Sequence, residues 1–254
     1  MTKTIAITGG GEGLGRVLAR RFAADGDRVI LLGRTFAKVE AVAEELGEPH
    51  FAVQCDVTDP DSVRSAFKTI GEKCDRLDVL VNNAASYEPF ELSDVTDSQL
   101  AATINTNLAG PILCAREALP LLQGGGHVVN VSSESVRLKF AMQWLYTATK
   151  AALEVCSEMW TRELEPQGVR STVVQCGQMF DESKTGSTWP MEVAIKFMEE
   201  NMKVGIDVRN RPLSHFKSVA EVFRAVIDTP PDVHLGIVTI SGNRPSDGQT
   251  KGNS

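Results

Sequence analysis

The sequence predicts a single-domain α/β protein in which about seven parallel strands form a doubly wound sheet with helices on both faces. Short apolar runs alternate with longer stretches of helical periodicity along the whole chain. A glycine-rich turn directly follows the first apolar run. Several of these runs are continuously apolar, as expected of parallel strands that are buried on both faces.

Composition limits the classes of function. The 254 residues fit one domain with a sizeable core, and 42% of them are hydrophobic. A formal net charge of -7 argues against nucleic acid or an anionic membrane as a partner. No apolar run approaches the roughly 18 residues of a membrane span. The first strand follows Met1 so closely that we expect no signal peptide and a cytoplasmic location.

The cysteines and histidines do not predict a metal site or disulfides. The chain has five cysteines and four histidines, which are scattered and show no ligand spacing. We therefore expect reduced, buried thiols and no metal.

The first strand and the turn after it form a candidate phosphate site. The run 4–8 leads into Gly9-Gly10-Gly11-Glu12-Gly13-Leu14-Gly15, and a helical pattern covers 16–24. Glycines let the backbone approach a pyrophosphate, and the free amides at a helix start donate hydrogen bonds to it. A plain tight loop is the alternative. The position between a strand and a helix favours nucleotide binding, with contacts expected from Thr8, Gly9, Gly11, Gly13, Leu14 and Gly15.

The end of the second strand, 29–32, favours NADP(H) over NAD(H). In dinucleotide-binding folds an acidic residue at this point binds the ribose 2′-hydroxyl. Here Gly33 holds the position, and Arg34 with Thr35 can bind a 2′-phosphate. The alternative for Arg34 is a surface side chain that points to water, and NAD(H) is the alternative cofactor.

The next two strands end in polar and small residues. After a helix that ends near residue 46, the strand 50–55 closes at Asp56-Val57. A helix at 61–72 precedes the strand 77–81, which ends in Asn82-Asn83-Ala84-Ala85. Small and amide residues at the carboxyl end of a buried strand leave space above the sheet, where ligands of doubly wound sheets bind.

The following elements carry the candidate reactive side chains. A helical pattern at 97–122, in two segments, has Asn107 in its middle, and the strand 127–131 leads to Ser132-Ser133. Tyr146 and Lys150 lie four residues apart, on one face of a helix that ends near 165. A nearby ammonium favours the phenolate and lowers the pKa of a tyrosine, which can then exchange a proton with a substrate oxygen. Taken alone, this spacing is more often an ordinary helix surface.

The last elements are a strand at 169–175, a helix at 219–227 and a strand at 236–240. We expect one dinucleotide-binding and catalytic domain over 1–242 and a polar C-terminal tail over 243–254.

Residues 178–218 are long for a connection and are predicted to form a substrate lid. Apolar residues recur there at helical spacing after Thr188 and Pro190, namely Met191, Ala194, Ile195, Met198 and Met202. With Phe180, Trp189 and Phe197 they predict an apolar face for a bulky apolar ketone or secondary alcohol. Packing of this stripe on the core is the alternative.

Five motifs resemble the short-chain dehydrogenase/reductase family, which has a Rossmann-like fold, in both order and spacing. They are Thr8-Gly9-x-x-x-Gly13-x-Gly15, Asn82-Asn83-Ala84, Asn107, Ser133 and Tyr146-x-x-x-Lys150. The resemblance covers the chain to about Gly177. One motif could arise by chance, but five in register are specific.

The resemblance implies a role for each matching residue. Tyr146 would donate a proton to the substrate oxygen, Ser133 would hydrogen-bond that oxygen, and Lys150 would lower the pKa of Tyr146 and hold the ribose hydroxyls. Asn107 would organise a water relay behind Lys150; its alternative is an amide that satisfies a helix kink. Ser133, thirteen residues before Tyr146, is selected over Ser132. Further cofactor contacts are implied for Asp56, Val57, Asn83, Ala84 and Gly177.

The chain departs from the family pattern at several positions. Family members usually follow the sixth strand with Pro-Gly and a threonine, whereas Cys176-Gly177 stands here and Asp181 is near the place of the threonine. Glu134 follows Ser133 where small residues are common. It is expected to be either a solvated charge or a carboxylate that faces the substrate. The glycine pair common near the family's C-terminus is replaced by Asn243-Arg244-Pro245.

The sequence therefore predicts an NADP(H)-dependent oxidoreductase that interconverts a ketone or aldehyde and an alcohol. A catalytically silent nucleotide-sensing regulator on the same fold is the alternative, and the intact Ser133, Tyr146 and Lys150 argue against it. Epimerisation or dehydration with a bound nicotinamide is disfavoured, because such relatives usually carry a larger C-terminal substrate region. Relatives pair through the helices that hold Asn107 and Tyr146, so a homodimer or homotetramer is expected.

Overall fold

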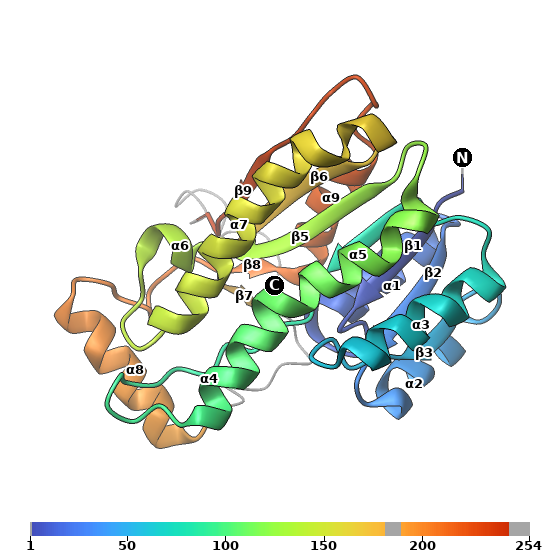
Figure 1. Ribbon diagram of the computed structural model, residues 1–254. Helices are drawn as coiled ribbons and strands as arrows, with labels where there is room; N and C mark the ends of the chain where they lie inside the picture. The colour runs from blue at the N-terminus through green and yellow to red at the C-terminus, as the bar shows by residue number, and fades with distance from the viewer. Residues whose placement is uncertain (1, 181–188, 244–254) are drawn as a thin grey trace, which may run out of the picture.

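A seven-stranded sheet with all neighbouring strands parallel organises the chain (Figure 1). The computed structural model describes residues 2–180 and 189–243. The strand order is β3-β2-β1-β4-β5-β6-β9, which confirms the predicted doubly wound fold. The strands are β1 (Thr4–Thr8), β2 (Arg28–Gly33), β3 (Phe51–Gln54), β4 (Val79–Asn82), β5 (His127–Ser133), β6 (Arg170–Cys176) and β9 (Ile237–Ile240).

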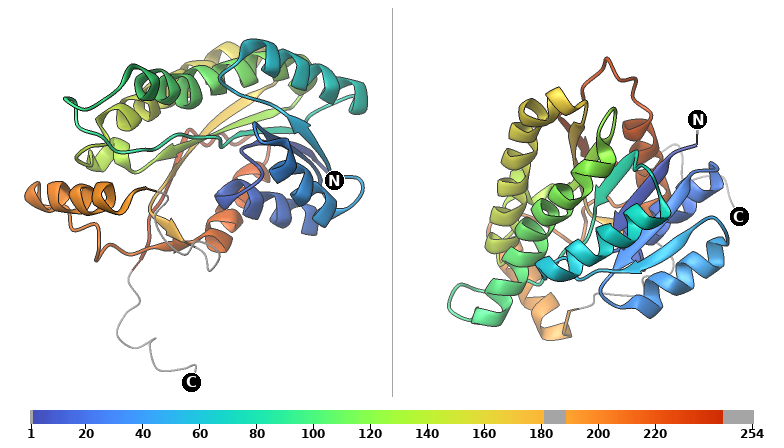
Figure 2. Two further views of the ribbon diagram at one scale, coloured as in Figure 1. Left: turned by 90° about the horizontal axis from the view of Figure 1, so that it is seen from below. Right: turned by 45° about the vertical axis from the view of Figure 1, so that its right-hand side comes forward.

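Helices cover both faces of the sheet (Figure 2). One layer contains α1 (Gly13–Ala24), α2 (Phe36–Leu46) and α9 (Phe216–Ile227). The other contains α3 (Pro60–Lys73), α4 (Asp97–Ile104), α5 (Gly110–Leu122) and α7 (Trp144–Leu164). α8 (Met191–Lys203) lies beyond the sheet, at the end where α4 and the start of α7 meet (Figures 1 and 2). None of the helices in the described ranges is long and apolar enough to cross a membrane.

Each face of the sheet has its own hydrophobic core. Leu18 and Phe22 of α1 and Phe223 of α9 are fully buried against one face. Ile70 of α3 and Ala118 of α5 are fully buried against the other. The strands β1, β4, β5 and β6 are buried along almost their whole length, which explains their apolar runs, whereas the edge strands β3 and β9 are only partly buried.

The structure differs from the prediction in short or irregular segments. The helical pattern at 97–122 is interrupted by a π-helical turn, η1 (Asn105–Ala109), which contains Asn107. A one-turn helix, α6 (Ser135–Leu138), and a second sheet of two-residue strands, β7 (Met179–Phe180) and β8 (Ser214–His215), were not predicted. Elements of two to four residues are too short to produce a periodic pattern.

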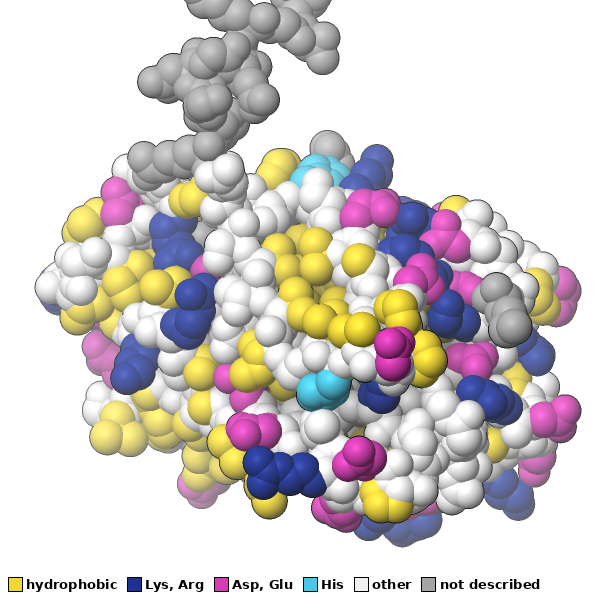
Figure 3. Space-filling model, turned by 90° about the horizontal axis from the view of Figure 1, so that it is seen from above, with side chains coloured by type: hydrophobic (Ala, Val, Ile, Leu, Met, Phe, Trp, Pro, Cys, Tyr) yellow, Lys and Arg dark blue, Asp and Glu magenta, His cyan; other side chains and the backbone are white. Residues whose placement is uncertain are grey.

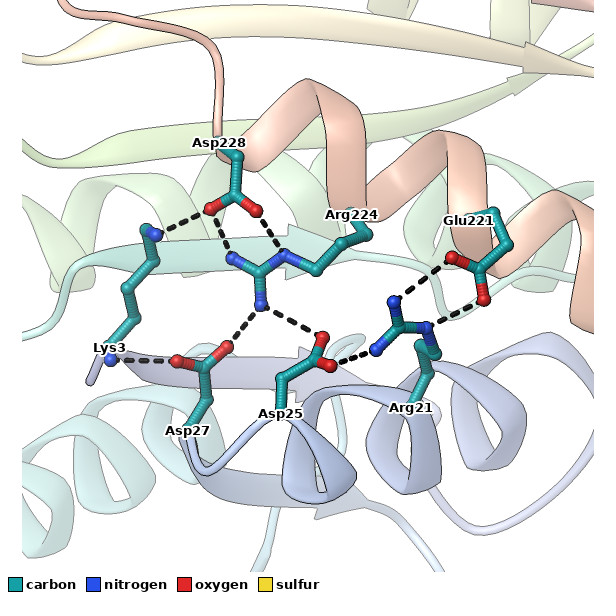
Figure 4. A network of polar contacts seen from close by, with 7 residues as sticks. All are labelled: Lys3, Arg21, Asp25, Asp27, Glu221, Arg224 and Asp228. Carbon is teal, nitrogen blue, oxygen red and sulfur yellow. Dashed lines mark hydrogen bonds and ion pairs between the residues drawn. The ribbon is translucent and has the colours of Figure 1, made fainter. Parts of the chain in front are cut away.

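Charged side chains join the amino end of the sheet to α1 and α9 (Figure 4). Arg224 pairs with Asp25, Asp27 and Asp228, and stands over the ring of Phe22, 5.5 Å from its centroid. The outer members of the network are the pairs Lys3–Asp228, Arg21–Asp25 and Arg21–Glu221. The backbone amide of Lys3 also donates to Asp27, at 2.8 Å.

Charges of both signs are mixed over the face drawn in Figure 3, where they surround a patch of hydrophobic side chains. The visible part of this face therefore does not present the continuous basic area that a nucleic acid would need.

Candidate active site

The glycine-rich turn is held against the end of β4 by Thr8 and Asn83. The Thr8 hydroxyl accepts hydrogen bonds from the backbone amides of Asn83, at 3.0 Å, and Ala84, at 3.1 Å. The Asn83 side-chain amide donates to the carbonyl oxygens of Thr8, at 2.9 Å, and Gly9, at 3.3 Å. Both residues predicted to contact a cofactor therefore also brace the turn.

Two glycines of this turn are required by close approach. A Cβ added at Gly15 would lie 2.3 Å from the carbonyl oxygen of Gly9, and one at Gly9 would lie 3.1 Å from Cα of Ala84. Gly9 also has a φ of +65°, a conformation that other residues rarely adopt. The turn therefore packs too closely on its neighbours for larger residues.

The start of α1 has features that fit a dinucleotide phosphate. Gly13 has a φ of +52°, and a Cβ built on it would meet nothing within 4 Å. The side chain of Glu12, at the N-cap of α1, makes no capping hydrogen bond, so it leaves the first amides of the helix without that partner. Amides at a helix start attract anions through hydrogen bonding and through the helix dipole. The residues present thus fit a nicotinamide dinucleotide.

The predicted 2′-phosphate residues lie at the end of β2. Arg34 is exposed, and no residue within the described ranges forms an ion pair with it. Lys38 lies against Gly11, because a Cβ at Gly11 would be 2.9 Å from Cβ of Lys38. The Lys38 ammonium is paired with Glu12 at 2.7 Å. Of the two cations in this region, Lys38 is therefore already neutralised by Glu12, whereas Arg34 is not paired within the described ranges.

The predicted neighbours of the adenine ring are Asp56 and Val57. Hydrogen bonds hold Asp56 in place, and packing holds Val57. The Asp56 carboxylate accepts from the amide of Thr58 at 3.0 Å, and its backbone amide donates to Ser62 at 2.9 Å. Val57 is buried and packs beside Gly110, since a Cβ at Gly110 would be 3.0 Å from Val57.

Ser133, Tyr146 and Lys150 meet at the carboxyl end of β5. The Ser133 side chain lies near enough to the Tyr146 phenol to act on its pKa, in the lowering direction. The Lys150 ammonium lies 5.8 Å from the centroid of the Tyr146 ring and donates to the carbonyl oxygen of Val131 at 2.7 Å. Lys150 is only 2% exposed, so its charge is largely removed from solvent.

The pKa of Tyr146 is shifted in the direction opposite to the prediction. Burial raises the pKa of this phenol to about 12, and the nearby Ser133 side chain offsets only part of that shift. Burial also lowers the pKa of Lys150 to about 8, although the neighbouring Cys176 and Glu154 act to raise it. The expected lowering of the tyrosine pKa by lysine is therefore wrong for the chain without a cofactor: desolvation of the phenolate is the largest cause of the shift, and Lys150 is not among its causes.

The amide of Asn107 connects three elements. Its side chain accepts from the backbone amide of Ser86 at 2.8 Å and donates to the carbonyl oxygen of Ser86 at 2.7 Å. It also donates to the hydroxyl of Thr149, the residue before Lys150, at 3.3 Å. These bonds go to the backbone of Ser86 and to Thr149 on α7, not to the backbone of the distorted helix. The alternative of an amide that satisfies a helix kink therefore stays untested. The water relay stays a prediction.

Asn82 and Ser132 hold the scaffold behind the site. Asn82 donates to the side chain of Asn130 at 2.8 Å, and Asn130 donates to Ser157 on α7 at 2.7 Å. The Ser132 hydroxyl donates to Glu154, in agreement with a structural role for this serine. Glu154, one helical turn after Lys150, was not singled out in the sequence.

Glu134 occupies neither of its two predicted environments. It is 3% exposed, and its carboxylate pairs with Arg211 and accepts from the backbone amide of Gln178 at 3.0 Å. Gly177 makes room for it, since a Cβ there would lie 3.2 Å from Glu134 Oε2 and 2.9 Å from the carbonyl oxygen of Ile240. The expectations of a solvated charge or a substrate-facing carboxylate are therefore both wrong.

The predicted lid helix exists as α8, but a different face of it is buried. Met191, Ile195 and Met202 are 80%, 41% and 52% exposed, whereas Phe197 and Asn201 are buried. A buried asparagine interrupts the apolar periodicity, so the stripe could not reveal this face. Asp181 and Thr188 lie outside the described residues.

Cys176, which replaces the usual proline, ends β6 beside Tyr146 and Lys150. It is 5% exposed, and burial raises the pKa of its thiol to about 12. Among the described residues, no group of three or more His, Cys, Asp or Glu side chains could hold a metal ion.

Comparison with known proteins agrees with this geometry. The family model for short chain dehydrogenases matches residues 3–189. The chain belongs to the short-chain dehydrogenase/reductase family. Members of this family are oxidoreductases, and the chain contains the features of a nicotinamide-dependent one.

Individual relatives within the family are distant. Carbonyl reductase family member 4 of Danio rerio is 29% identical over 229 residues, which are 89% of this chain and 90% of that protein. D-xylose 1-dehydrogenase of Caulobacter vibrioides is 35% identical over 182 residues, or 70% of this chain and 72% of that protein. A solved short chain dehydrogenase from Burkholderia cenocepacia, in complex with NADP, has a TM-score of 0.79 and 28% identity, and covers 95% of this chain and 96% of that one.

Proposed function

We propose that the protein is an NADP(H)-dependent short-chain dehydrogenase/reductase that interconverts a ketone or aldehyde and an alcohol. The observation that carries the proposal is that Ser133, Tyr146 and Lys150 meet at the carboxyl end of β5, with Lys150 buried beside the Tyr146 ring. This group lies at the same edge of the sheet as the glycine-rich turn, because the strands are parallel. When bound, the nicotinamide supplies or accepts the hydride.

The protein's own residues would handle the proton and the charge on oxygen. The raised pKa keeps Tyr146 protonated at neutral pH, so the phenol can donate its proton to a carbonyl oxygen during reduction. Ser133 would donate a hydrogen bond to the same oxygen and stabilise the negative charge that develops there. Lys150 would hold the ribose hydroxyls through its ammonium.

The preference for NADP(H) rests on Arg34 and Thr35. The exposed guanidinium of Arg34 is available for a 2′-phosphate, and the Burkholderia relative was solved in complex with NADP. We expect Arg34→Ala to weaken NADPH binding roughly tenfold or more, as charged hydrogen bonds do when removed, with NADH binding unchanged. Equal losses for both cofactors would contradict the 2′-phosphate role.

The substrate is proposed to be bulky and apolar. Tyr87, Trp189, Phe197 and Phe140 form a row of ring contacts beside the site, with centroid distances of 6.1 Å, 5.2 Å and 6.2 Å in that order. Lys196, next to Phe197, is paired with Glu91 at 2.7 Å. Such a wall favours an aryl or long-chain carbonyl compound over a charged one.

A homodimer or homotetramer in the cytoplasm remains part of the proposal. Large apolar side chains are exposed on α5 and α7, where family members were expected to pair, with Ile112, Val155 and Met159 at 38%, 61% and 58%. Sedimentation of the purified protein measures the oligomeric state. A single species with the mass of a monomer would contradict the proposed homo-oligomer.

Ketone-dependent oxidation of NADPH, followed by absorbance, tests the function. We expect turnover with at least one of acetophenone, 4-phenyl-2-butanone and 2-decanone, and none by the Tyr146→Phe variant above about one-hundredth of the parent rate. NADPH binding without turnover of any carbonyl compound would favour the nucleotide-sensing regulator.

A further inference from the structure

The carboxylate of Glu134 joins both ends of a long segment to the strand that carries Ser133. One oxygen accepts from the backbone amide of Gln178, which directly follows β6 and Gly177. The other pairs with Arg211, three residues before β8. The side chain of Glu134 is 4% exposed and that of Arg211 is 20% exposed. Breaking a buried ion pair on one side leaves an uncompensated charge, so this contact is energetically significant.

The two ends of the segment also bind each other. The backbone amide of Ser214 donates to the carbonyl oxygen of Gln178 at 3.0 Å, and β7 pairs with β8. Arg211 stacks on the ring of Phe140, 5.2 Å from its centroid. The planar guanidinium thus contacts Glu134 and Phe140 together, which a lysine could not do in the same way.

A second anchor connects this segment to the chain just before Tyr146. We call residues 189–213 the α8 arm. Asn201 of the arm is fully buried, and its side chain accepts from the amide of Ala141 at 3.0 Å and donates to the carbonyl oxygen of Ala141 at 3.4 Å. Ala141 lies between Lys139 and Met142, whose φ values of 54° and 62° are unusual for residues other than glycine. Such a conformation persists where the surroundings hold it.

The α8 arm therefore contacts two segments that adjoin the proposed catalytic residues, at Glu134 after Ser133 and at Ala141 before Tyr146. We propose that Glu134 is a positioning residue, whose pairing with Arg211 and Gln178 fixes the α8 arm, and with it the apolar wall of the substrate site, relative to Ser133 and Tyr146. The consequence for kinetics rests on the proposed function, whereas the consequence for the arm itself does not.

The mechanical part of this inference is tested by hydrogen exchange on the full chain without cofactor. We expect Glu134→Gln to speed exchange about tenfold or more in peptides that span residues 197–215 and 139–143, since one partner of a buried ion pair is lost. Peptides from β1 to β4 should exchange as in the parent protein. Arg211→Met, which keeps an apolar stem on Phe140, should give the same pattern.

A double variant and a matched control make this test specific. Glu134→Gln combined with Arg211→Met should be no worse than Arg211→Met alone, because the two residues act as one unit. Glu200→Gln removes an exposed ion pair with Lys203 on the same helix and should leave exchange unchanged. Arg211 is the more exposed partner, so its variant tests the pair even where Glu134→Gln fails to fold.

The kinetic part separates positioning from chemistry. With NADPH and acetophenone as the probe, we expect KM to rise about tenfold in both single variants while kcat stays within about twofold, because Ser133, Tyr146 and Lys150 lie on β5 and α7 and not on the arm. The dissociation constant of NADPH should not change.

Three results would overturn the proposal. Unchanged exchange in the arm for both single variants would show that the pair does not hold it. Faster exchange across the whole sheet would show general destabilisation. A fall in kcat at constant KM would show that Glu134 acts on the chemical step. If the parent reduces no ketone, the proposed function fails while the exchange pattern still decides the role of the pair.

Discussion

The two ends of the sheet use charged residues in opposite ways. At the amino end, burial alone would lower the pKa of Arg224, yet its hydrogen bonds to Asp228 and Asp27 raise it. At the carboxyl end, burial lowers the pKa of Lys150 to about 8, and its neighbours do not restore it. Charges that are fully paired stabilise the fold, whereas charges that are desolvated without a matched partner remain available for chemistry.

The largest effect is expected from Tyr146→Phe. Removal of the phenol oxygen should lower kcat for ketone reduction about 10³-fold, within the range known for loss of a positioned acid. The melting temperature should change by no more than a few degrees, because the ring stays in place. If Tyr146→Phe lowered the melting temperature strongly as well as kcat, the carboxyl end of the sheet would not differ from the amino end in the way described.

A comparable effect on stability, but not on rate, is expected from Arg224→Met. This change leaves Asp27, which is 4% exposed, without its cation, and should cost about 3 kcal/mol of unfolding free energy in urea titrations. Arg64→Met, which removes an exposed pair with Asp61, should cost less than about 1 kcal/mol. If Arg224→Met lowered kcat at temperatures where the variant is folded, the charges at the amino end would also affect the chemistry, which contradicts the comparison.

The pH dependence of activity should sharpen the comparison. Lysine is charged only below its pKa, so kcat/KM for ketone reduction should fall as pH rises through about 8, the value to which burial lowers the pKa of Lys150. Tyr146, whose pKa is raised to about 12, keeps its proton over the same range. A rate that stays level to pH 10 would contradict this assignment.

The same lysine has an effect on stability whose sign can be stated. Its folded pKa of about 8 is below the ordinary lysine value of 10.5, so the unfolded chain binds more protons between these pH values. Unfolding free energy should therefore rise with pH from about 8 to 10.5 on account of Lys150. The advantage of Lys150→Met over the parent in urea titrations should shrink across that interval.

The smallest effect is expected at the rim of the charged network. Lys3→Met removes a pair with Asp228 in which the side chains are 26% and 47% exposed. Exposed pairs contribute little, so the unfolding free energy should drop by about 0.5 kcal/mol. A loss as large as that of Arg224→Met would mean that the network behaves as one unit.

The sequence was sufficient where local pattern decides the structure. Buried strands have an apolar run, and the turn at Gly9 to Gly15 needs glycine, so both could be predicted. The spacing of Tyr146 and Lys150 predicted that they share one helix face, and the family resemblance implied that Ser133 meets them. The direction of the Tyr146 pKa shift was not predictable, since it depends on burial by segments distant in sequence.

Contacts over long sequence separations explain the remaining errors. Glu134 and Arg211 are 77 residues apart, and neither position has a local pattern that indicates the other. Asn201 is polar at a position where the helical stripe of α8 suggested exposure, yet its partner is the backbone of Ala141. Backbone partners leave no trace in side-chain periodicity.

The contact between Glu134 and Arg211 also sets a rule for recombination with relatives. Transplanting the segment from 178 to 213 out of another family member would remove Arg211 and leave the buried carboxylate of Glu134 without its cation. A side chain at position 177 would crowd the same carboxylate. Residues 134, 177 and 211 therefore depend on one another. A chimera designed for a new substrate has to take all three from the same parent protein.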